Sequence, residues 1–140
     1  MITYKEICAS KVDDSLLEEI KSIYESESWY AYLHDDQKLM RAFHQSLYLV
    51  GAFSDEQLIG FVRCVGDGEH VLLVQDLIVH HDWQKQGIGT KLFQSAWEHY
   101  ADVRQFFVVT DLDSSYLHEF YRSFGMATLE KQHCISFMRI

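Results

Sequence analysis

Residues 84–92 read QKQGIGTKL, and they place Gly87 and Gly89 where an apolar run gives way to an amphipathic segment. The first turn of a helix leaves backbone N–H groups without partners and carries a partial positive charge, so it suits phosphate oxygens. A glycine has no Cβ, and an anion can therefore approach the backbone itself. The stretch predicts a helix whose first turn binds a pyrophosphate.

Two other phosphate motifs do not fit these residues. A P-loop requires G-x-x-x-x-G-K-[ST], whereas this chain has Gly89, Thr90 and Lys91 in that order and lacks the first glycine. A dinucleotide fingerprint requires a third glycine, where this chain has Leu92, and an acid about 20 residues further on. The chain is apolar at that distance, over residues 107–109. The motif that remains is Q-x-x-G-x-G.

Outward from this motif, the spacing of apolar residues predicts alternating helices and strands. Strands are expected over residues 2–8, 48–53, 58–65, 71–79, 106–109 and 134–140. Helices are expected from residue 15 to residues 26–28, over a segment that begins at Asp35 or Asp36, and over residues 88–100 and 116–124. The short connections between the three middle strands favour antiparallel pairing. This order predicts an α/β fold with one mixed, mostly antiparallel sheet flanked by helices on both faces.

Local patterns refine three of these elements. Ser15 and Glu18 stand at the spacing of a capping box, which predicts that Ser15 begins the first helix. The second helix is expected to turn Leu39, Phe43 and Leu47 inward. Residues 106–109 are apolar on both faces, which is typical of a buried central strand.

The composition predicts a single domain that spans residues 1–140. Hydrophobic residues make up 48% of the chain, enough for one core, and the apolar runs are too short to cross a membrane. The N-terminus does not read as a signal peptide and the three cysteines are widely spaced, so a reducing cytoplasm is expected and a disulfide framework or zinc site is not. The net charge of -9 opposes binding to nucleic acid and favours a cationic small molecule.

The chain resembles the GNAT superfamily of acetyl-CoA-dependent N-acetyltransferases. The resemblance rests on the element order, on DLIVHHDW at 76–83, on QKQGIG at 84–89, and on FYRSFGM at 120–126, which is similar to the family's F-Y-x-x-x-G-F. It implies transfer of an acetyl group from acetyl-CoA to a primary amine by direct attack in a ternary complex. The acceptor would be a small cationic amine, an amino acid or a lysine side chain. A catalytically silent coenzyme A sensor is the alternative function.

The resemblance also implies the coenzyme site. The backbone of Leu77, Ile78 and Val79 would pair with the pantetheine arm as if it were another strand. Gln84 matches the Gln or Arg at the head of the family's turn. The pyrophosphate would be held by the N–H groups of the turn, from Lys85, Gln86, Gly87, Ile88, Gly89 and Thr90. The chain departs from the family at His81, where relatives often have Pro, and at Ser114, where they often have Asn.

Two residues are predicted to be catalytic. Tyr121 matches the family tyrosine that faces the thioester sulfur, where it would donate a hydrogen bond to the leaving thiolate. Asp76 matches a Glu or Asp that many relatives have before the coenzyme strand. A base there would help an alkylamine, whose pKa is about 10.4, to lose its proton before attack. The alternative role of Asp76 is structural, as an acid that holds a backbone N–H or a basic neighbour.

The segment ESESWYAYLHDD, residues 25–36, is a candidate wall of the acceptor site. Its Trp29, Tyr30 and Tyr32 could stack on or pair with an amine, although packing against a neighbouring helix explains them as well. No metal is expected, because His118-Glu119 does not continue into H-E-x-x-H. Monomer and homodimer both remain open.

Overall fold

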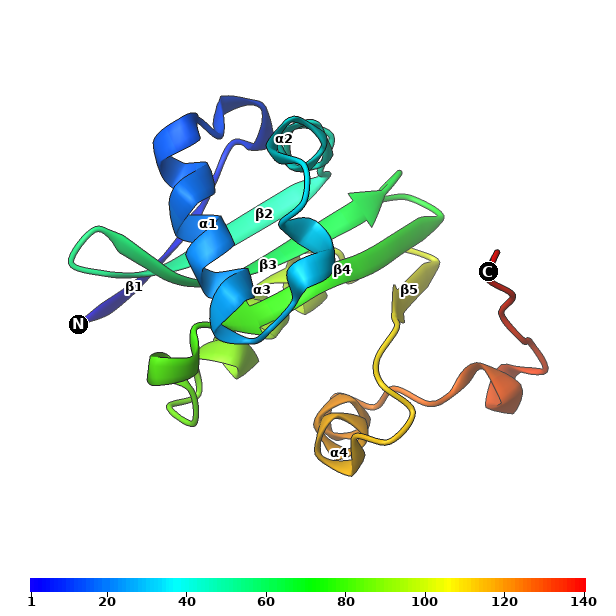
Figure 1. Ribbon diagram of the computed structural model, residues 1–140. Helices are drawn as coiled ribbons and strands as arrows, with labels where there is room; N and C mark the ends of the chain where they lie inside the picture. The colour runs from blue at the N-terminus through cyan, green and yellow to red at the C-terminus, as the bar shows by residue number, and fades with distance from the viewer. The chain divides into compact units, whose positions relative to one another are not determined.

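The computed structural model describes all of residues 1–140 (Figure 1). The chain forms two compact units, Met1–Val108 and Val109–Ile140. The strands of the first unit are β1 (Ile2–Glu6), β2 (Tyr48–Ser54), β3 (Gln57–Gly66), β4 (Val71–Val79) and β5 (Gln105–Val108). Its helices are α1 (Asp14–Ser26), α2 (Asp36–His44) and α3 (Ile88–His99), with short 3-10 turns η1 (Ala9–Lys11), η2 (Tyr30–Tyr32) and η3 (His81–Trp83).

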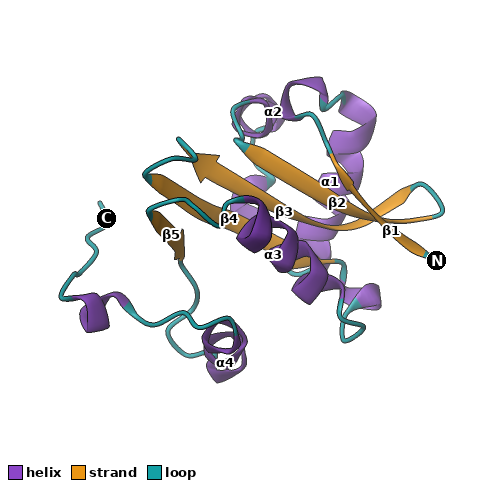
Figure 2. Ribbon diagram, turned by 180° about the vertical axis from the view of Figure 1, so that it is seen from behind, coloured by secondary structure: helices purple, strands orange, loops and turns teal.

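The five strands form one sheet in the order β1-β2-β3-β4-β5. Neighbours from β1 to β4 pair antiparallel, and β4 pairs parallel with β5. Helices α1 and α2 lie on one face of the sheet and α3 lies on the other (Figures 1 and 2). The prediction of a mixed, mostly antiparallel sheet with helices on both faces is therefore confirmed.

Apolar side chains of the helices fill both faces of the sheet. On the side of α1 and α2, one buried cluster includes Leu17, Ile20, Ile23, Tyr24, Leu39, Phe43, Phe61 and Ile78. On the other side, α3 buries Ile88, Leu92, Phe93 and Ala96. β2 and β3 are buried almost throughout because helices cover them on both faces.

Two of the predicted helix details are wrong. Asp13, and not Ser15, begins α1, because its carboxylate accepts the Leu16 N–H at 2.9 Å. Asp35 begins α2 in the same way, through the Lys38 N–H at 3.1 Å. The second helix ends at His44, so Leu47 lies beyond it and is 36% exposed instead of facing inward.

β5 is an edge strand and not the buried central strand that its sequence indicates. It pairs with β4 alone, through Val71–Val74 of that strand, and its Phe106, Phe107 and Val108 are only partly buried. An apolar pattern indicates that both faces of a strand are covered, but it does not indicate whether a strand pairs with it on each side. The remaining residues of β4, from Gln75 to Val79, therefore have no strand partner on the β5 side.

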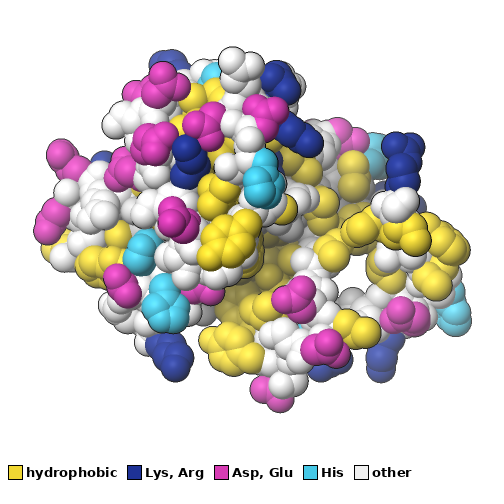
Figure 3. Space-filling model, viewed as in Figure 1, with side chains coloured by type: hydrophobic (Ala, Val, Ile, Leu, Met, Phe, Trp, Pro, Cys, Tyr) yellow, Lys and Arg dark blue, Asp and Glu magenta, His cyan; other side chains and the backbone are white.

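The second unit contains α4 (Ser115–Ser123) and the short turn η4 (Leu129–Gln132). The Ser114 hydroxyl accepts the Leu117 N–H at 3.4 Å and begins α4, and Gly125 follows the helix in the left-handed region at φ 89°. The predicted strand over residues 134–140 is wrong, because this segment forms no regular structure. It is exposed along its whole length, and Figure 3 shows hydrophobic side chains on the surface of this part of the chain.

Candidate active site

The loop between β4 and α3 exposes backbone N–H groups at the start of a helix. Lys85 and Gly87 both have left-handed backbones, at φ 64° and 80°, on either side of Gln86. Alternation of this kind turns successive N–H groups toward one side and forms an anion-binding concavity. Gly87 is the N-cap of α3 and supplies no side-chain cap, so the first-turn N–H groups of the helix remain available to a ligand.

The two glycines of this loop have different reasons to be glycine. Gly87 needs its left-handed backbone, and a Cβ there would meet no atom within 4 Å. Gly89 has no such backbone, and a Cβ there would rest against Val79 Cγ2 at 3.8 Å, an ordinary contact. The open side of the loop therefore lies at Gly87, whereas Gly89 faces the sheet. Ile88, between them, is buried and anchors the loop in the core.

The turn η3 holds the loop against the end of β4. The His80 N–H donates to Ile59 O of β3 at 2.8 Å, and the His80 ring accepts the Asp82 N–H at 3.1 Å. The Gln84 side chain donates to Val79 O at 2.9 Å and also to Glu27, just beyond α1. The structure thus places Gln84 as a tie between strand, loop and helix.

Leu77 and Val79 lie on the edge of β4 that β5 leaves uncovered. Peptide groups alternate in direction along a strand. Because the His80 N–H points to β3, those of Ile78 also face β3, and those of Leu77 and Val79 face the free edge. The bond from Gln84 to Val79 O agrees with this direction. An extended ligand can form strand-like bonds here, chiefly with Leu77 and with the Val79 N–H.

Asp76 is buried in a polar cluster and is only 1% exposed. Its Oδ2 accepts Arg63 Nε at 2.7 Å and the Tyr24 hydroxyl at 2.8 Å, and its Oδ1 accepts the Tyr32 hydroxyl at 2.7 Å. Burial is the largest single effect on the pKa of Arg63 and would lower it, but the charge and hydrogen bond of Asp76, together with Tyr24 and Tyr32, raise that pKa above its ordinary value. Arg63 therefore keeps its charge beside Asp76, and both carboxylate oxygens of Asp76 accept hydrogen bonds.

Sequence reasoning did not find Arg63, Tyr24 and Tyr32 as partners of Asp76. The available signal was Arg63, a charged residue within the apolar run of β3. Its place opposite Asp76 follows from the β3–β4 register, which shifts between Arg63 and Cys64 so that Gln75 is an extra residue in β4. A register of this kind is a tertiary property.

The acceptor-wall residues predicted from the sequence lie around η2. Trp29 is 37% exposed and stacks on Tyr24 with ring centroids 6.1 Å apart, whereas Tyr30 is 56% exposed. The Tyr32 ring also stacks on Tyr24, with ring centroids 4.2 Å apart and an interplanar angle of 14°. The structure thus brings Trp29 and Tyr32 to the same buried tyrosine, and Tyr30 is open to solvent.

Tyr121 lies on α4 in the second unit and is 8% exposed. Its ring meets Phe120 edge to face, with centroids 5.1 Å apart. Burial raises the pKa of Tyr121 to about 12. The hydroxyl therefore keeps its proton at neutral pH and is a hydrogen-bond donor. Of its neighbours on the helix, His118 is partly buried and Glu119 is exposed.

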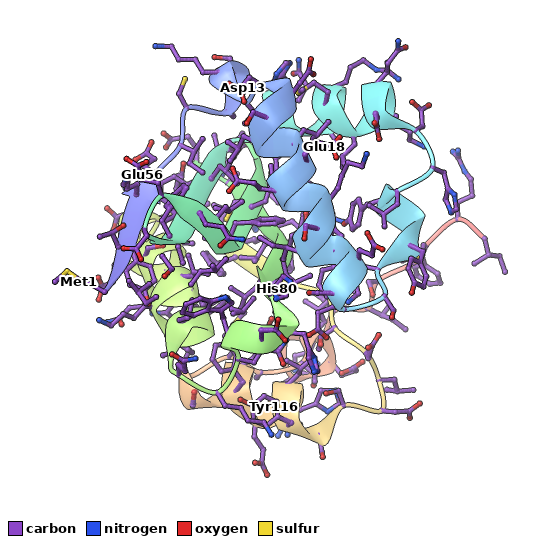
Figure 4. All side chains as sticks on the ribbon, turned by 60° about the vertical axis from the view of Figure 1, so that its left-hand side comes forward. Met1, Asp13, Glu18, Glu56, His80 and Tyr116 are labelled. Carbon is purple, nitrogen blue, oxygen red and sulfur yellow. The ribbon has the colours of Figure 1, made fainter.

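A groove of about 470 Å³ lies between α1 and η3. Its lining includes Glu18, Glu19, Asp82, His80 and Trp83, and Figure 4 shows Glu18 on α1 and His80 just after β4. Three carboxylates repel phosphate, so the phosphate-binding features of this region belong to the loop and not to the groove.

No cluster of three or more His, Cys, Asp or Glu side chains has metal-binding geometry. None of the helices combines the length and apolar character needed to span a bilayer.

Comparison with known proteins agrees with this geometry. Residues 14–126 match the family model of the acetyltransferase (GNAT) family. Among solved structures, the chain is similar to a GNAT family acetyltransferase, protein SP0256, from Streptococcus pneumoniae TIGR4, with 31% identity over 100% of this chain and 98% of that one and a TM-score of 0.84. No curated protein matches the chain.

More distant structures share the fold. A putative acetyltransferase from Deinococcus radiodurans R1 has 19% identity over 99% of this chain and 87% of that one, with a TM-score of 0.72. The aminoglycoside acetyltransferase meta-AAC0020 from an uncultured soil metagenomic sample, solved in complex with sisomicin, has 18% identity over 99% and 95% of the two chains, with a TM-score of 0.71.

The family model and the structure from Streptococcus pneumoniae define an acetyltransferase class, and the chain belongs to the GNAT acetyltransferase family. Membership implies N-acetyltransferase activity with acetyl-CoA as the cosubstrate. The expectations of a transferase and of a GNAT-like fold are confirmed. The coenzyme-binding, catalytic and acceptor residues stay predictions.

Proposed function

We propose that this chain transfers an acetyl group from acetyl-CoA to a primary amine by direct attack in a ternary complex. The observation that carries the proposal is the loop at residues 84–90. In this loop Lys85 and Gly87 have left-handed backbone conformations, and α3 begins directly after Gly87, next to the free edge of β4. A pyrophosphate and an extended arm attached to it match these two features. The family match over residues 14–126 runs across both compact units and supports one catalytic domain over residues 1–140.

The coenzyme would be bound mainly by main chain. The pyrophosphate would be held by the backbone N–H groups of the loop, which belong to Lys85, Gln86, Gly87, Ile88, Gly89 and Thr90. The partial positive charge at the N-terminus of α3 would add to this binding. The pantetheine arm would lie along β4 over Leu77, Ile78 and Val79, and it would bond the peptide groups of Leu77 and Val79, which face the free edge. Gln84 would contribute by fixing the loop, because its side chain already bonds Val79 O.

The acetyl group would pass directly to the amine. The nitrogen lone pair forms a bond to the carbonyl carbon, and the bond from carbon to sulfur breaks. The amine gives up one proton and the leaving thiolate takes up one, so the products are the amide and the free thiol of coenzyme A. Tyr121 would donate a hydrogen bond to the departing sulfur, a role that its retained proton supports. Asp76 as the base stays a prediction, and its bonds to Arg63 and two tyrosines favour the alternative structural role.

The acceptor would be a small cationic amine, an amino acid or a lysine side chain. Acidic side chains are spread over the face that carries α1 and α2 (Figure 3), and the net charge of -9 favours a cation. The aromatic residues Trp29 and Tyr30 would stack on it. The complex of one distant relative with sisomicin, an amine-rich molecule, adds an aminoglycoside to the acceptors that deserve a test.

Acetylation of an amine panel tests the proposal. The panel contains spermidine, 2-phenylethylamine, free lysine, a lysine peptide and sisomicin, and free thiol released from acetyl-CoA is measured. Turnover that requires both the enzyme and an amine is expected. Acetyl-CoA binding without turnover of any amine would favour the silent sensor. Melting temperatures measured with acetyl-CoA, NAD and ATP test the coenzyme site, and a rise with NAD or ATP but not with acetyl-CoA would overturn it.

A further inference from the structure

We propose that the Tyr32 hydroxyl orients the acceptor by accepting a hydrogen bond from the amine N–H, and that Arg63 and Asp76 are positioning residues that fix this hydroxyl. The inference rests on the proposed function and deepens it. It assigns the residue that would align the attacking nitrogen, on a side chain outside the coenzyme loop.

The Tyr32 hydroxyl has one acceptor position left. It donates its only proton to Asp76 Oδ1 at 2.7 Å and accepts Gln75 Nε2 at 3.1 Å. A hydroxyl has two acceptor lone pairs, so one remains for a ligand. Burial and the Asp76 charge both raise the pKa of Tyr32, which keeps the phenol neutral and its proton committed to the carboxylate. A ligand therefore meets an acceptor at this oxygen.

The cluster behind Tyr32 fixes the direction of this hydroxyl. Arg63 is held by Asp76, by the Ser46 hydroxyl at 3.3 Å and by the face of the Phe43 ring, 4.9 Å from its guanidinium carbon. Arg63 and Asp76 are 4% and 1% exposed, and Tyr24, which bonds the second carboxylate oxygen, is fully buried. Tyr32 is only partly buried. Among the groups that bond Asp76, it is the one that reaches solvent.

The place where the Tyr32 hydroxyl meets β4 suits a residue that binds the acceptor. Its two polar partners, Gln75 and Asp76, are the first residues of the part of β4 that β5 leaves uncovered, and Leu77–Val79 follow them. The end of an arm bound along that edge would thus lie near the Tyr32 hydroxyl. All of these residues belong to the first compact unit.

The chemistry of the amine fits an acceptor oxygen. A nucleophilic amine must keep its lone pair for the carbonyl carbon, so only its N–H groups are free to bind the protein. An oxygen that accepts one N–H fixes the nitrogen without blocking attack. Asp76 cannot take this role itself, because its oxygens are buried and already bonded. The expected acceptors are primary or secondary amines, since a tertiary amine has no N–H to offer.

Tyr32→Phe and Tyr24→Phe form a matched pair of variants that tests this role. Each removes one hydroxyl that donates to one oxygen of Asp76, but only Tyr32 reaches solvent. Steady-state kinetics use the panel amine that the wild-type chain acetylates with the highest kcat/KM. We expect Tyr32→Phe to lower kcat/KM for the amine at least tenfold, mainly through KM, with the Kd for acetyl-CoA within twofold. Tyr24→Phe should lower kcat/KM clearly less than Tyr32→Phe does, even where it lowers Tm.

Each remaining outcome counts against a stated claim. Equal losses of kcat/KM in the two variants would show a structural effect of the cluster and overturn the role of Tyr32. An unchanged Tyr32→Phe enzyme would overturn it as well, with the proposed function intact. Absence of turnover by the wild-type chain with every amine would overturn the proposed function and this inference together.

Discussion

At the residue scale, Tyr121 shows how burial limits the chemistry of a side chain. Its pKa of about 12 lies some 3.5 units above the thiol reference of about 8.5, so complete proton transfer to the leaving thiolate is uphill by about 5 kcal/mol. A hydrogen bond that stabilises the thiolate does not carry that cost. Tyr121 is therefore better suited to donate a hydrogen bond than to give up its proton early in the reaction.

Replacement of Tyr121 by Phe tests this role. We expect kcat to fall at least tenfold and the Kd for acetyl-CoA to stay within twofold, because the hydroxyl acts on the departing sulfur and not on the phosphates. Steady-state assays of released thiol give kcat, and calorimetric titration with acetyl-CoA gives the Kd. Tyr116→Phe, on the exposed face of the same helix, is the control. A turnover number unaltered by Tyr121→Phe would refute the assignment.

Asp76 is expected to matter first for stability. In Asp76→Asn, Arg63 stays charged and 4% exposed without its carboxylate, so the free energy of unfolding should drop by about 3–5 kcal/mol in urea titrations. Asp82→Asn, at an exposed carboxylate, is the control.

The pH profile of turnover separates the two roles of Asp76. Loss or displacement of the acidic limb in Asp76→Asn identifies a base, whereas a retained limb leaves the positioning role.

At the scale of elements, the loop and α3 depend on backbone conformation more than on side chains. Gly87→Ala should cost about 1–2 kcal/mol in stability, because an L side chain is strained at φ 80°. It should also weaken acetyl-CoA binding at least tenfold, because the new Cβ enters the open side of the loop. Urea titration and calorimetry measure the two effects.

Gly89→Ala is the matched control for this element. The added Cβ would make an ordinary contact with Val79 Cγ2 at 3.8 Å, on the side of the sheet. Stability and acetyl-CoA affinity should both change little, since alanine is also a better helix former than glycine. If Gly87→Ala binds acetyl-CoA as well as Gly89→Ala does, the loop is not the phosphate site.

At the scale of the whole molecule, the two units differ in how their backbones are held. β2 and β3 pair with a strand on both sides over most of their length, whereas residues 134–140 form no regular structure. The tail also exposes Ile135, Phe137, Met138 and Ile140. Local stability follows burial and hydrogen bonding, so opening should be easiest in the tail.

Hydrogen exchange followed by mass spectrometry checks this difference. Peptides from residues 134–140 should exchange within seconds at neutral pH, and those from β2 and β3 should be the slowest in the chain. Acetyl-CoA should slow exchange over residues 77–90 and leave β1 unchanged, so β1 is the internal control. Slow exchange of the tail in the free protein would contradict its irregular structure.

The sequence alone determined much of this protein. Apolar periodicity predicted the order of the helices and the five strands from β1 to β5, because each element buries one face and the spacing of its apolar residues records that face. Q-x-x-G-x-G and the later FYRSFGM pointed to the GNAT family, because a left-handed turn and a helix start require particular residues at fixed spacing.

Only the tertiary structure decided which residues meet. Asp76, Arg63, Tyr24 and Tyr32 come from four elements, β4, β3, α1 and η2. The shifted register of β3 and β4 places Arg63 opposite Asp76, and both tyrosines donate to the Asp76 carboxylate. The tertiary structure also decided that β5 is an edge strand and that residues 134–140 are not a strand. Local patterns record what each segment prefers, whereas pairing partners and charge contacts depend on segments far apart in the chain, which no local pattern contains.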